Sequence, residues 1–327
     1  MINVAVIGAG NWGKNHIRTL SVMDNVRLKS VCDIDEEKLR IVKRNYPNIE
    51  ITGEPKDIFE DSSIEGIVIA SSSGSHFSLA KLALENDKDV LVEKPLTLDS
   101  TSAEILIKKA EERKRILMVG HLLIYHPVVK KIKELIKSGE IGQIYYLYSQ
   151  RVNLGSIRKT ESSLWNLGPH DISVALYLLE DEPDSVSAYG ESYIQKDVND
   201  VVFLNLHFPN RVIANIHISW LDPHKVRKLT IVGSKKMVVF DDMEVREKMK
   251  IYDKGVDNIN YNSFGEYISL RFGDVLIPEL ELDEPIKLED AHFIECIQKR
   301  IKPITDGENG LKVIKILEEA EKSLRNN

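Results

Sequence analysis

Short apolar runs alternate with longer amphipathic ones over the first 120 residues. Apolar runs with polar ends are typical of strands buried on both faces of a parallel sheet. Such runs predict strands over Ile2–Ile7, Val26–Cys32, Gly66–Ala70, Val90–Val92 and Ile116–Val119. Between them, helical spacing of apolar positions predicts helices over Trp12–Met23, Glu36–Asn45, Ser75–Asn86 and Ser100–Lys114. Strand alternating with helix implies a doubly wound parallel sheet with right-handed crossovers.

A different pattern begins after Gly120, and strand-like runs dominate from residue 184 to about residue 282. Two of them, Val202–Phe208 and Val212–Trp220, flank a Pro-Asn-Arg turn, which predicts a hairpin. Polar and apolar residues alternate in the second run, as expected of an antiparallel sheet with one buried face. The other elements predicted in this half are helices over Pro127–Lys137, Pro169 to about Leu179, Lys287–Arg300 and Gly310–Leu324, and a strand over Ile144–Val152.

Length and composition describe a two-domain globular protein. The 327 residues exceed the usual size of one hydrophobic core, so we predict domains over 1–121 and 122–327, with the closing helices free to pack back on the first. The net charge of −7 and the absence of a basic block argue against a nucleic-acid partner. Without a membrane-spanning apolar stretch or a signal peptide, the chain is expected to be cytoplasmic, with no membrane partner.

The chain has two cysteines, Cys32 and Cys296, and both lie inside apolar runs. We therefore expect each thiol to be buried and unpaired. The sequence has neither a CxxC nor an HExxH motif, so no metal site is expected.

A glycine motif directly follows the first predicted strand. Gly8-Ala9-Gly10-Asn11-Trp12-Gly13 matches GxGxxG and opens a helix, which is the context that a dinucleotide-binding turn requires. Gly8 permits the tight turn, Gly10 lets the backbone approach a pyrophosphate, and Gly13 lets helix and strand pack closely. The helix N-terminus would face the negative charge of the phosphates. The alternative is an ordinary glycine-rich turn between strand and helix.

Asp33 ends the second predicted strand, a little over 20 residues beyond the glycines. A carboxylate there accepts hydrogen bonds from a ribose diol and repels a 2′-phosphate. The residues that follow include no arginine, and this favours NAD over NADP as the cofactor. The competing interpretation is a solvated helix cap, although Asp35 is the better N-cap candidate.

Glu93-Lys94-Pro95 follows the strand Val90–Val92, at the sheet edge where ligands of open α/β folds bind. Pro95 restricts Lys94 to an extended backbone and so helps to fix its direction. A nicotinamide cation nearby would destabilise the ammonium form of Lys94 and move it toward acid/base use. On composition alone, a surface lysine would be the ordinary interpretation.

These motifs together resemble the glucose–fructose oxidoreductase and inositol dehydrogenase family (Gfo/Idh/MocA). The resemblance rests on the glycine motif, on Ser73 with His76, on Glu93-Lys94-Pro95, on Gly139-Glu140-Ile141-Gly142, and on Ala320 and Ser323 in the closing helix. It implies an N-terminal Rossmann domain and a C-terminal open-faced, mostly antiparallel sheet with flanking helices. It also implies NAD-dependent hydride transfer at a carbohydrate-like alcohol, and a homodimer or homotetramer formed through the sheet. The residues it implies for cofactor binding are Gly8, Gly10, Asn11, Trp12, Gly13, Asp33, Ser73, His76, Glu93 and Lys94.

A second catalytic segment is expected at Trp165-Asn166-Leu167-Gly168-Pro169-His170-Asp171. The family has an aspartate four residues before a histidine here, and the resemblance makes His170 an acid/base together with Lys94. If Pro169 takes the first helical position, His170 lies in the first turn, where the helix dipole keeps its ring neutral. A histidine that only caps a helix is the alternative. Asn166 departs from the family pattern, and an amide cannot take up a proton.

The segment Arg151-Val152-Asn153-Leu154-Gly155, with Arg158, is similar to that of the UDP-N-acetylglucosamine 3-dehydrogenase branch. Arginine recognises a diphosphate or carboxylate well, but both arginines could instead pair with acids at a subunit interface. The substrate-binding residues expected on this resemblance are Tyr125, Arg151, Asn153, Arg158, Trp165, Asn166 and His170. Tyr125 and His126 could equally be structural, and His207 and His217 fit the polar face of the sheet.

The function expected is oxidation of the 3-hydroxyl of UDP-N-acetylglucosamine or its uronate. Two rival functions remain open at this stage. One is a dehydrogenase of a free sugar or a cyclitol such as inositol, and the other is a non-catalytic NAD-binding sensor. A pair such as Lys94 and His170 argues against the sensor, which has no need of acid/base groups.

Overall fold

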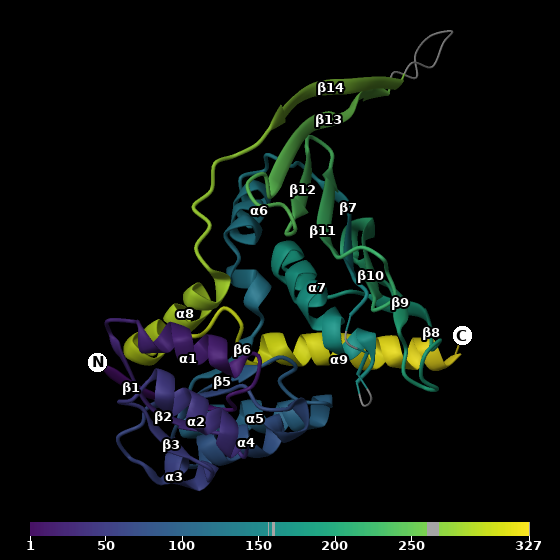
Figure 1. Cartoon of the computed structure of the whole chain (residues 1–327). Coiled ribbons are helices and arrows are strands. Elements are labelled where there is room, and N and C mark those ends of the chain that lie inside the picture. The colour runs from purple at the N-terminus through teal and green to yellow at the C-terminus, as the bar shows by residue number, and fades with distance from the viewer. Residues whose placement is uncertain (156, 159–160, 260–267, 327) are drawn as a thin grey trace. The chain divides into compact units, whose positions relative to one another are not determined.

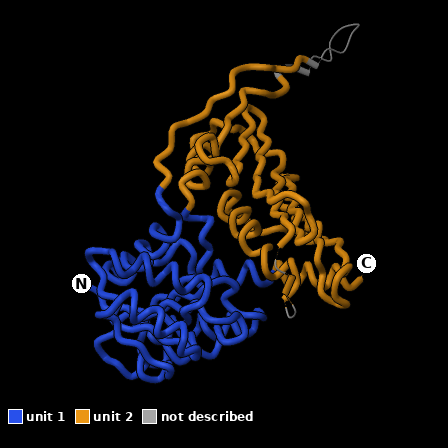
Figure 2. Tube along the Cα trace, in the orientation of Figure 1, with its two compact units in different colours: residues 1–125, 283–315 blue, residues 126–282, 316–327 orange. Residues whose placement is uncertain are grey.

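The computed structural model consists of two compact units (Figure 2). The first unit holds residues 1–125 and 283–315, and the second holds residues 126–282 and 316–327. The structure describes all residues except 156, 159–160, 260–267 and 327.

A six-stranded parallel sheet forms the middle of the first unit (Figure 1). Its strand order is β3-β2-β1-β4-β5-β6, and every neighbouring pair runs parallel. The strands are β1 (Ile2–Ile7), β2 (Val26–Cys32), β3 (Glu50–Thr52), β4 (Gly66–Ile69), β5 (Asp89–Glu93) and β6 (Leu117–Gly120). The order reverses between β1 and β4, and ligands of such sheets bind outside the carboxyl ends of the strands at that point.

Helices cover this sheet because its central strands are apolar on both faces. Ala5 and Val6 are neighbours on β1 and so point to opposite faces of the sheet, and neither has exposed surface, so helices must bury both faces. Among the helices, α8 lies against α1 (Figure 1), and it also contacts η1. The helical elements are α1 (Gly13–Ser21), α2 (Glu36–Asn45), α3 (Pro55–Glu60), α4 (Ser73–Glu85), α5 (Ser100–Arg113), η1 (Leu122–Tyr125), α8 (Pro285–Lys299) and α9 (Gly307–Asn326), which continues into the second unit.

The first unit extends beyond the predicted limit of residue 121, and it also takes in residues 283–315. The backbone explains this grouping, because the N–H of Val119 on β6 donates to the carbonyl of Thr305 at 2.7 Å. The hydroxyls of Tyr125 and Thr305 are also hydrogen-bonded at 3.0 Å. The segment that contains Thr305 thereby continues the edge of the sheet beside β6.

An eight-stranded sheet forms most of the second unit, in the order β14-β13-β12-β11-β7-β10-β9-β8. In the part of the chain that the structure describes, β7 and β10 run parallel and the other neighbouring pairs run antiparallel. The strands are β7 (Ile144–Val152), β8 (Ser185–Glu191), β9 (Val201–Phe208), β10 (Val212–Ser219), β11 (Val226–Gly233), β12 (Met237–Asp241), β13 (Met249–Ile259) and β14 (Ile268–Leu276). The helical elements are α6 (Pro127–Lys137), α7 (Ser163–Leu179) and η2 (Pro209–Arg211).

One face of this sheet is covered by α7, which packs on β7, β9 and β10. Alternate residues of β10 explain the choice of face, because Ala214, Ile216 and Ile218 are fully buried while Asn215 and His217 are not. The fold class expected from the sequence, a Rossmann sheet followed by a mostly antiparallel sheet, is confirmed.

The start of α7 corrects the prediction. The helix begins at Ser163, six residues before Pro169, and the Ser162 side chain caps it by accepting from the Trp165 N–H at 3.4 Å. Pro169 therefore lies inside the helix, where it lacks a hydrogen-bond donor, and not at the first position. His170 is not in the first turn, so the helix-dipole argument for a neutral ring does not apply to it.

Two smaller findings complete the fold. Cys32 and Cys296 are buried and unpaired, as predicted, and burial raises the pKa of the two thiols to about 12 and about 11. Among the described residues, no helix combines the length and the apolar character needed to cross a bilayer.

Candidate functional site

The glycine turn joins β1 to α1 and has the geometry that a dinucleotide needs. Gly8 has φ +102°, in the region that favours glycine, and a Cβ there would lie 2.6 Å from the carbonyl oxygen of Ala70. A Cβ on Gly13 would lie 1.8 Å from the carbonyl oxygen of Gly8. By contrast, a Cβ on Gly10 would meet nothing within 4 Å. Two glycines thus close the turn, and the third leaves open space beside the backbone where a pyrophosphate would lie.

Asp33 follows β2 and is hydrogen-bonded to the glycine turn. Its Oδ2 accepts from the Ala9 N–H at 2.7 Å, and its Oδ1 accepts from the Asp35 N–H at 2.8 Å. The Asp35 side chain caps α2 by accepting from the N–H groups of Glu37 and Lys38. The Asp33 carboxylate therefore binds the glycine turn, and the Asp35 carboxylate caps α2.

The remaining residues of the predicted cofactor set lie at the carboxyl edge of the same sheet. Asn11 and Trp12 are exposed in the glycine turn, and Ser73 is the first residue of α4, after β4. His76 is buried, and its Nδ1 lies 2.8 Å from the carbonyl oxygen of Pro95. Burial lowers the pKa of His76, so the neutral ring ties α4 to the turn after β5.

Glu93 is the last residue of β5, and Lys94 is the first residue beyond it. The Lys94 side chain is half-buried, whereas Glu93 is 8% exposed. Oε2 of Glu93 accepts from the backbone N–H of Lys94 at 3.1 Å. A Cβ on Gly120 of neighbouring β6 would lie 3.2 Å from that same oxygen, so glycine makes room for the Glu93 carboxylate.

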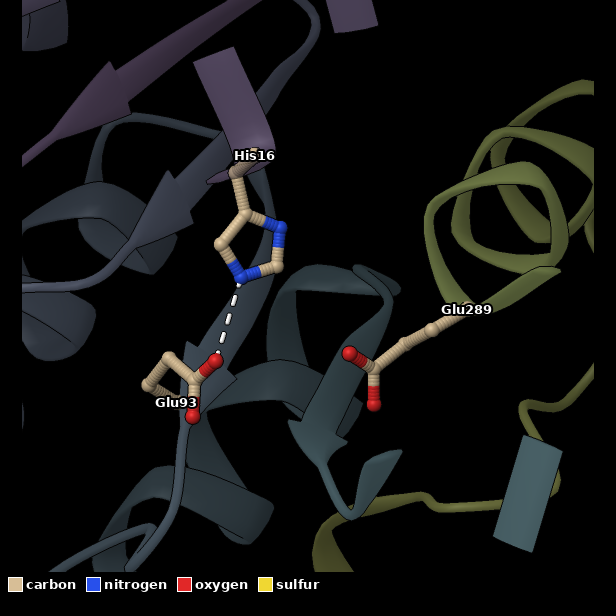
Figure 3. Close-up of side chains that lie close together, drawn as sticks. All are labelled: His16, Glu93 and Glu289. Atoms are coloured by element: carbon tan, nitrogen blue, oxygen red, sulfur yellow. Dashed lines mark hydrogen bonds and ion pairs between the residues drawn. The ribbon is translucent and has the colours of Figure 1, made fainter. Parts of the chain in front are cut away.

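Behind Glu93 lies a buried group of titratable side chains, from α1, β5 and α8 (Figure 3). Nε2 of His16 lies 3.1 Å from Oε1 of Glu93, and Nδ1 lies 2.8 Å from Oδ1 of Asp290. Glu289 points toward the same place. One ring nitrogen of His16 and one carboxylate oxygen each of Glu93 and Glu289 lie within 4.8 Å of one another. His16, Glu289 and Asp290 are fully buried.

In the second unit, His170 lies on α7, is half-buried, and is followed by a buried aspartate. Asp171 forms a bidentate ion pair with Arg151 of β7, with Nε to Oδ2 at 2.5 Å and Nη2 to Oδ1 at 3.3 Å. The side chains of Arg151 and Asp171 are 10% and 9% exposed. This pair fixes the part of α7 that carries His170 against the sheet.

A second acid–base contact lies at the N-terminus of α7. Glu161 accepts from Asn166 Nδ2 at 3.1 Å and from Arg158 Nη1 at 2.7 Å. The Glu161 side chain is 13% exposed, and that of Arg158 is 56% exposed. The Glu161 carboxylate thus contacts Asn166 directly. Asn166 and His170 lie on the same helix, α7.

Other predicted substrate residues lie apart from these contacts. Trp165 is 8% exposed, and its indole N–H donates to Glu321 at 2.7 Å. Asn153 follows β7 and is half-buried. Tyr125 belongs to the first unit and is fully buried against His292, which favours the structural role that the sequence left open for it.

Sequence reasoning missed His16, Glu289, Asp290 and Glu161. His16 could have been found, because it follows Gly13 by three residues and so lies one helical turn further along α1. Glu289 and Asp290 gave no such signal, since acids on an amphipathic helix are ordinarily solvated. Glu161 directly precedes the cap of α7. A helix predicted to start at Pro169 leaves Asn166 outside it, so no sequence pattern indicated the contact between Glu161 and Asn166.

Two family models match the chain. Residues 2–121 match the model described as "Oxidoreductase family, NAD-binding Rossmann fold", and residues 129–239 match the "GFO/IDH/MocA C-terminal domain". Together these matches cover more than half of the chain.

Individual relatives match nearly end to end at low identity. Myo-inositol 2-dehydrogenase of Thermotoga maritima is 23% identical over 99% of this chain and 96% of its own length. UDP-N-acetylglucosamine 3-dehydrogenase of Acidithiobacillus ferrooxidans is 23% identical over 96% of this chain and 94% of its own. The solved structure of that enzyme, GnnA, covers 99% of this chain and 98% of its own at 21% identity, with a TM-score of 0.85.

A further structure bears on the cofactor. GenD2 from gentamicin A biosynthesis, solved in complex with NAD, covers 99% of this chain and 97% of its own at 21% identity, with a TM-score of 0.82. In this chain, the open space at Gly10 and the carboxylate of Asp33 fit the NAD-binding Rossmann fold that the family model over residues 2–121 describes. The chain belongs to the Gfo/Idh/MocA family of oxidoreductases, with an NAD-binding Rossmann domain at its N-terminal end.

Proposed function

We propose that this protein oxidises the 3-hydroxyl of a UDP-N-acetylhexosamine, UDP-N-acetylglucosamine or its uronate, to a ketone. Bound NAD⁺ would accept the hydride from the carbon. His170 would take up the hydroxyl proton, and the Lys94 ammonium would stabilise the negative charge that develops on oxygen.

The observation that carries the proposal is the position of Lys94. It directly follows β5, which neighbours β4, and β4 neighbours β1, whose carboxyl end is the glycine turn. Its backbone is fixed by the buried Glu93, and its side chain is only half-buried. A positioned lysine at this edge is suited to act on a substrate that lies beside the cofactor.

Two observations support a UDP-sugar. A sequence relative named UDP-N-acetylglucosamine 3-dehydrogenase matches 96% of the chain. In addition, Arg158 is 56% exposed and pairs with Glu161 through Nη1, so its guanidinium is open to solvent and able to meet a diphosphate. Arg151, committed to Asp171, would support the site by holding α7, and Asn153, Trp165 and Asn166 would line it.

A cyclitol is the second candidate substrate, and one observation favours it. The Thermotoga maritima relative that matches 99% of this chain is a myo-inositol 2-dehydrogenase. An inositol ring has no diphosphate, so it would make no use of Arg158. The two candidates therefore differ in their dependence on this arginine.

The test is a spectrophotometric assay of NAD⁺ reduction with UDP-N-acetylglucosamine, its uronate and myo-inositol as separate substrates. A carbonyl-trapping reagent is included to remove the ketone. The proposal expects reduction with a UDP-sugar, loss of it in Lys94→Ala and His170→Ala, and a raised KM in Arg158→Met. Turnover of inositol alone, unchanged in Arg158→Met, would replace the UDP-sugar by a cyclitol.

We further propose that the protein forms a homodimer or homotetramer through the sheet face opposite α7. Tyr146, Tyr189 and Phe203 lie on that face and are 43%, 58% and 45% exposed, and the Phe203 ring stacks on His217. Such an apolar, aromatic face is typical of a subunit interface. Light scattering coupled to size exclusion should give two or four chains, and Phe203→Asp should give monomers. A monomeric wild type would refute this assembly.

A further inference from the structure

The group of side chains behind Glu93 places one imidazole between two carboxylates. His16 is fully buried, and its two ring nitrogens face Glu93 and Asp290 at 3.1 and 2.8 Å. A neutral imidazole has a single N–H, so it donates to one carboxylate and meets the lone pairs of the other. An imidazolium has two N–H groups and donates to both. The geometry therefore favours the charged ring.

The local electrostatics agree with this assignment. Burial alone would lower the pKa of His16, but the charge of Asp290 and hydrogen bonds to both carboxylates raise it well above its usual value. Burial raises the pKa of Glu93, yet the hydrogen bond and the charge of His16 outweigh it and lower the pKa. Burial raises the pKa of Asp290, and the charge of His16 opposes this shift.

Glu289 adds a proton but no charge. Both of its oxygens are buried without a hydrogen-bond partner among the described residues, and burial holds its pKa well above the usual range. With Glu289 protonated, the imidazolium and the Lys94 ammonium balance the carboxylates of Glu93 and Asp290. An ionised Glu289 would leave an uncompensated buried charge, which is costly.

Three further titratable groups around these side chains are neutral near pH 7. Burial lowers the pKa of His121 to about 4, and its Nδ1 is hydrogen-bonded to Asn309. Burial raises the pKa of Tyr125 far above 10.0 and that of Cys296 to about 11. None of the three supplies a positive charge to Glu93 and Asp290, whereas His16 lies between the two carboxylates and the charge of Lys94 also lowers the pKa of Glu93.

The Glu93 carboxylate connects this group to Lys94. Its Oε1 faces His16, and its Oε2 accepts from the Lys94 N–H. Both oxygens are thus engaged, one on each side, and Gly120, which has no Cβ, leaves room for Oε2. A rotation of the carboxylate after loss of His16 would release the backbone of Lys94.

We propose that His16, held as an imidazolium between Glu93 and Asp290, is a positioning residue that fixes Glu93 and through it the backbone of Lys94. The effect of His16 on turnover rests on the proposed catalytic role of Lys94, but the protonation state of His16 does not. The protonation state of His16 can be measured without any substrate.

The first experiment is ¹⁵N NMR of the histidine rings in the full chain, with His16→Gln used to assign the His16 signals. We expect both ring nitrogens of His16 to be protonated at about pH 8, where an ordinary histidine is neutral. Asp290→Asn should lose this signature, whereas Glu295→Gln, an exposed acid on the same helix, should keep it. A neutral His16 in the wild type would overturn the proposal, and this result requires no substrate.

The second experiment asks whether the cluster positions Lys94. His16→Gln and Asp290→Asn should lower kcat by about tenfold or more, leave the Kd for NAD⁺ within about twofold, and shift the pH profile of kcat/KM. Lower thermal stability with unchanged kcat and pH profile would make the cluster merely structural. If no tested substrate is turned over while His16 is an imidazolium, the substrate assignment fails and the charged cluster stands.

Discussion

The carboxylate of Asp33 and the backbone of Ala9 form a direct hydrogen bond, Oδ2 accepting from the N–H at 2.7 Å. The residue expected to select the cofactor ribose therefore also holds the turn that receives the pyrophosphate. Asp33 is only 9% exposed, so this bond is shielded from water. The expected selection of the ribose and the shape of the turn would therefore depend on one side chain.

Replacing Asp33 by Asn tests this coupling. The amide keeps an acceptor for one backbone N–H but loses the charge and one of the two acceptors, so NAD⁺ binding should weaken by about tenfold, near 1.4 kcal/mol. The preference for NAD⁺ over NADP⁺ should fall at the same time, because the repulsion of a 2′-phosphate is gone. Fluorescence titration of both cofactors measures this, and Asp35→Asn, which removes the neighbouring carboxylate at the cap of α2, is the matched control. Equal binding by Asp33→Asn and wild type would contradict the assignment.

Much of the fold could be predicted from periodicity, because buried strands and amphipathic helices carry their own signals. The glycine turn, Asp33 and the Glu93-Lys94-Pro95 turn follow strands that were placed correctly, so their common edge was also predictable. The start of α7 could not be predicted in this way. Proline is common at the first position of a helix, so Pro169 indicates a start that the chain does not use, and the helix is capped by Ser162 instead.

The buried cluster could not be predicted for a different reason. His16 and Glu93 come from the first half of the chain and Asp290 from its end, and no periodicity indicates that α8 packs on α1. Charged residues buried as a set compensate one another only after the fold has brought them together. Composition and spacing describe each of them as a solvated residue.

Alanine at Gly10 and at Gly13 should have opposite consequences. Gly13→Ala places a methyl group 1.8 Å from a backbone carbonyl oxygen, so the turn must deform and the free energy of unfolding should fall by about 3 kcal/mol. Gly10→Ala meets nothing within 4 Å, so stability should change by no more than about 1 kcal/mol. Its methyl group would instead occupy the approach of the pyrophosphate, and NAD⁺ binding should be lost. Thermal melts with and without NAD⁺ separate the two effects, and a Gly10→Ala protein that binds NAD⁺ normally would refute the assignment of the turn.

The buried Arg151–Asp171 pair should contribute strongly to the stability of the second unit once either partner is removed. Asp171→Asn leaves a guanidinium that is 10% exposed without its counter-charge, which costs about 3–5 kcal/mol. Arg158 is 56% exposed and its partner Glu161 keeps a hydrogen bond from Asn166, so Arg158→Met should cost far less, about 1 kcal/mol. Urea unfolding of the two variants gives both numbers. Similar losses in both would mean that Arg151 is not fixed by Asp171.

The stability of the protein should depend on pH through Glu289. Burial raises the pKa of Glu289 in the folded state. The stability that the protonated side chain contributes is therefore fully present below the unfolded pKa of 4.5 and is lost as the pH rises through the folded pKa. Glu289→Gln removes this loss because the amide is always neutral. The variant should therefore gain stability relative to the wild type as the pH rises above 4.5 in a series of thermal melts. Parallel curves for the two proteins would show that Glu289 is not buried as a neutral acid, and Glu295→Gln controls for the removal of a carboxylate.

The amide of Asn166 and the carboxylate of Glu161 should tolerate being swapped together, but not replacement of Asn166 alone by an acid. Asn166→Asp restores the residue that the family pattern has at this position, but it faces Glu161 at a distance of 3.1 Å, where two carboxylates repel. The single change should lower the free energy of unfolding and reduce turnover. Glu161→Gln added to it returns an amide–carboxylate contact with the roles reversed, and should recover most of both losses. A double-mutant cycle, read in urea unfolding and in kcat, measures this coupling. Additive losses would mean that Glu161 and Asn166 act independently, and that an aspartate is disfavoured at position 166 for some reason other than the neighbouring carboxylate.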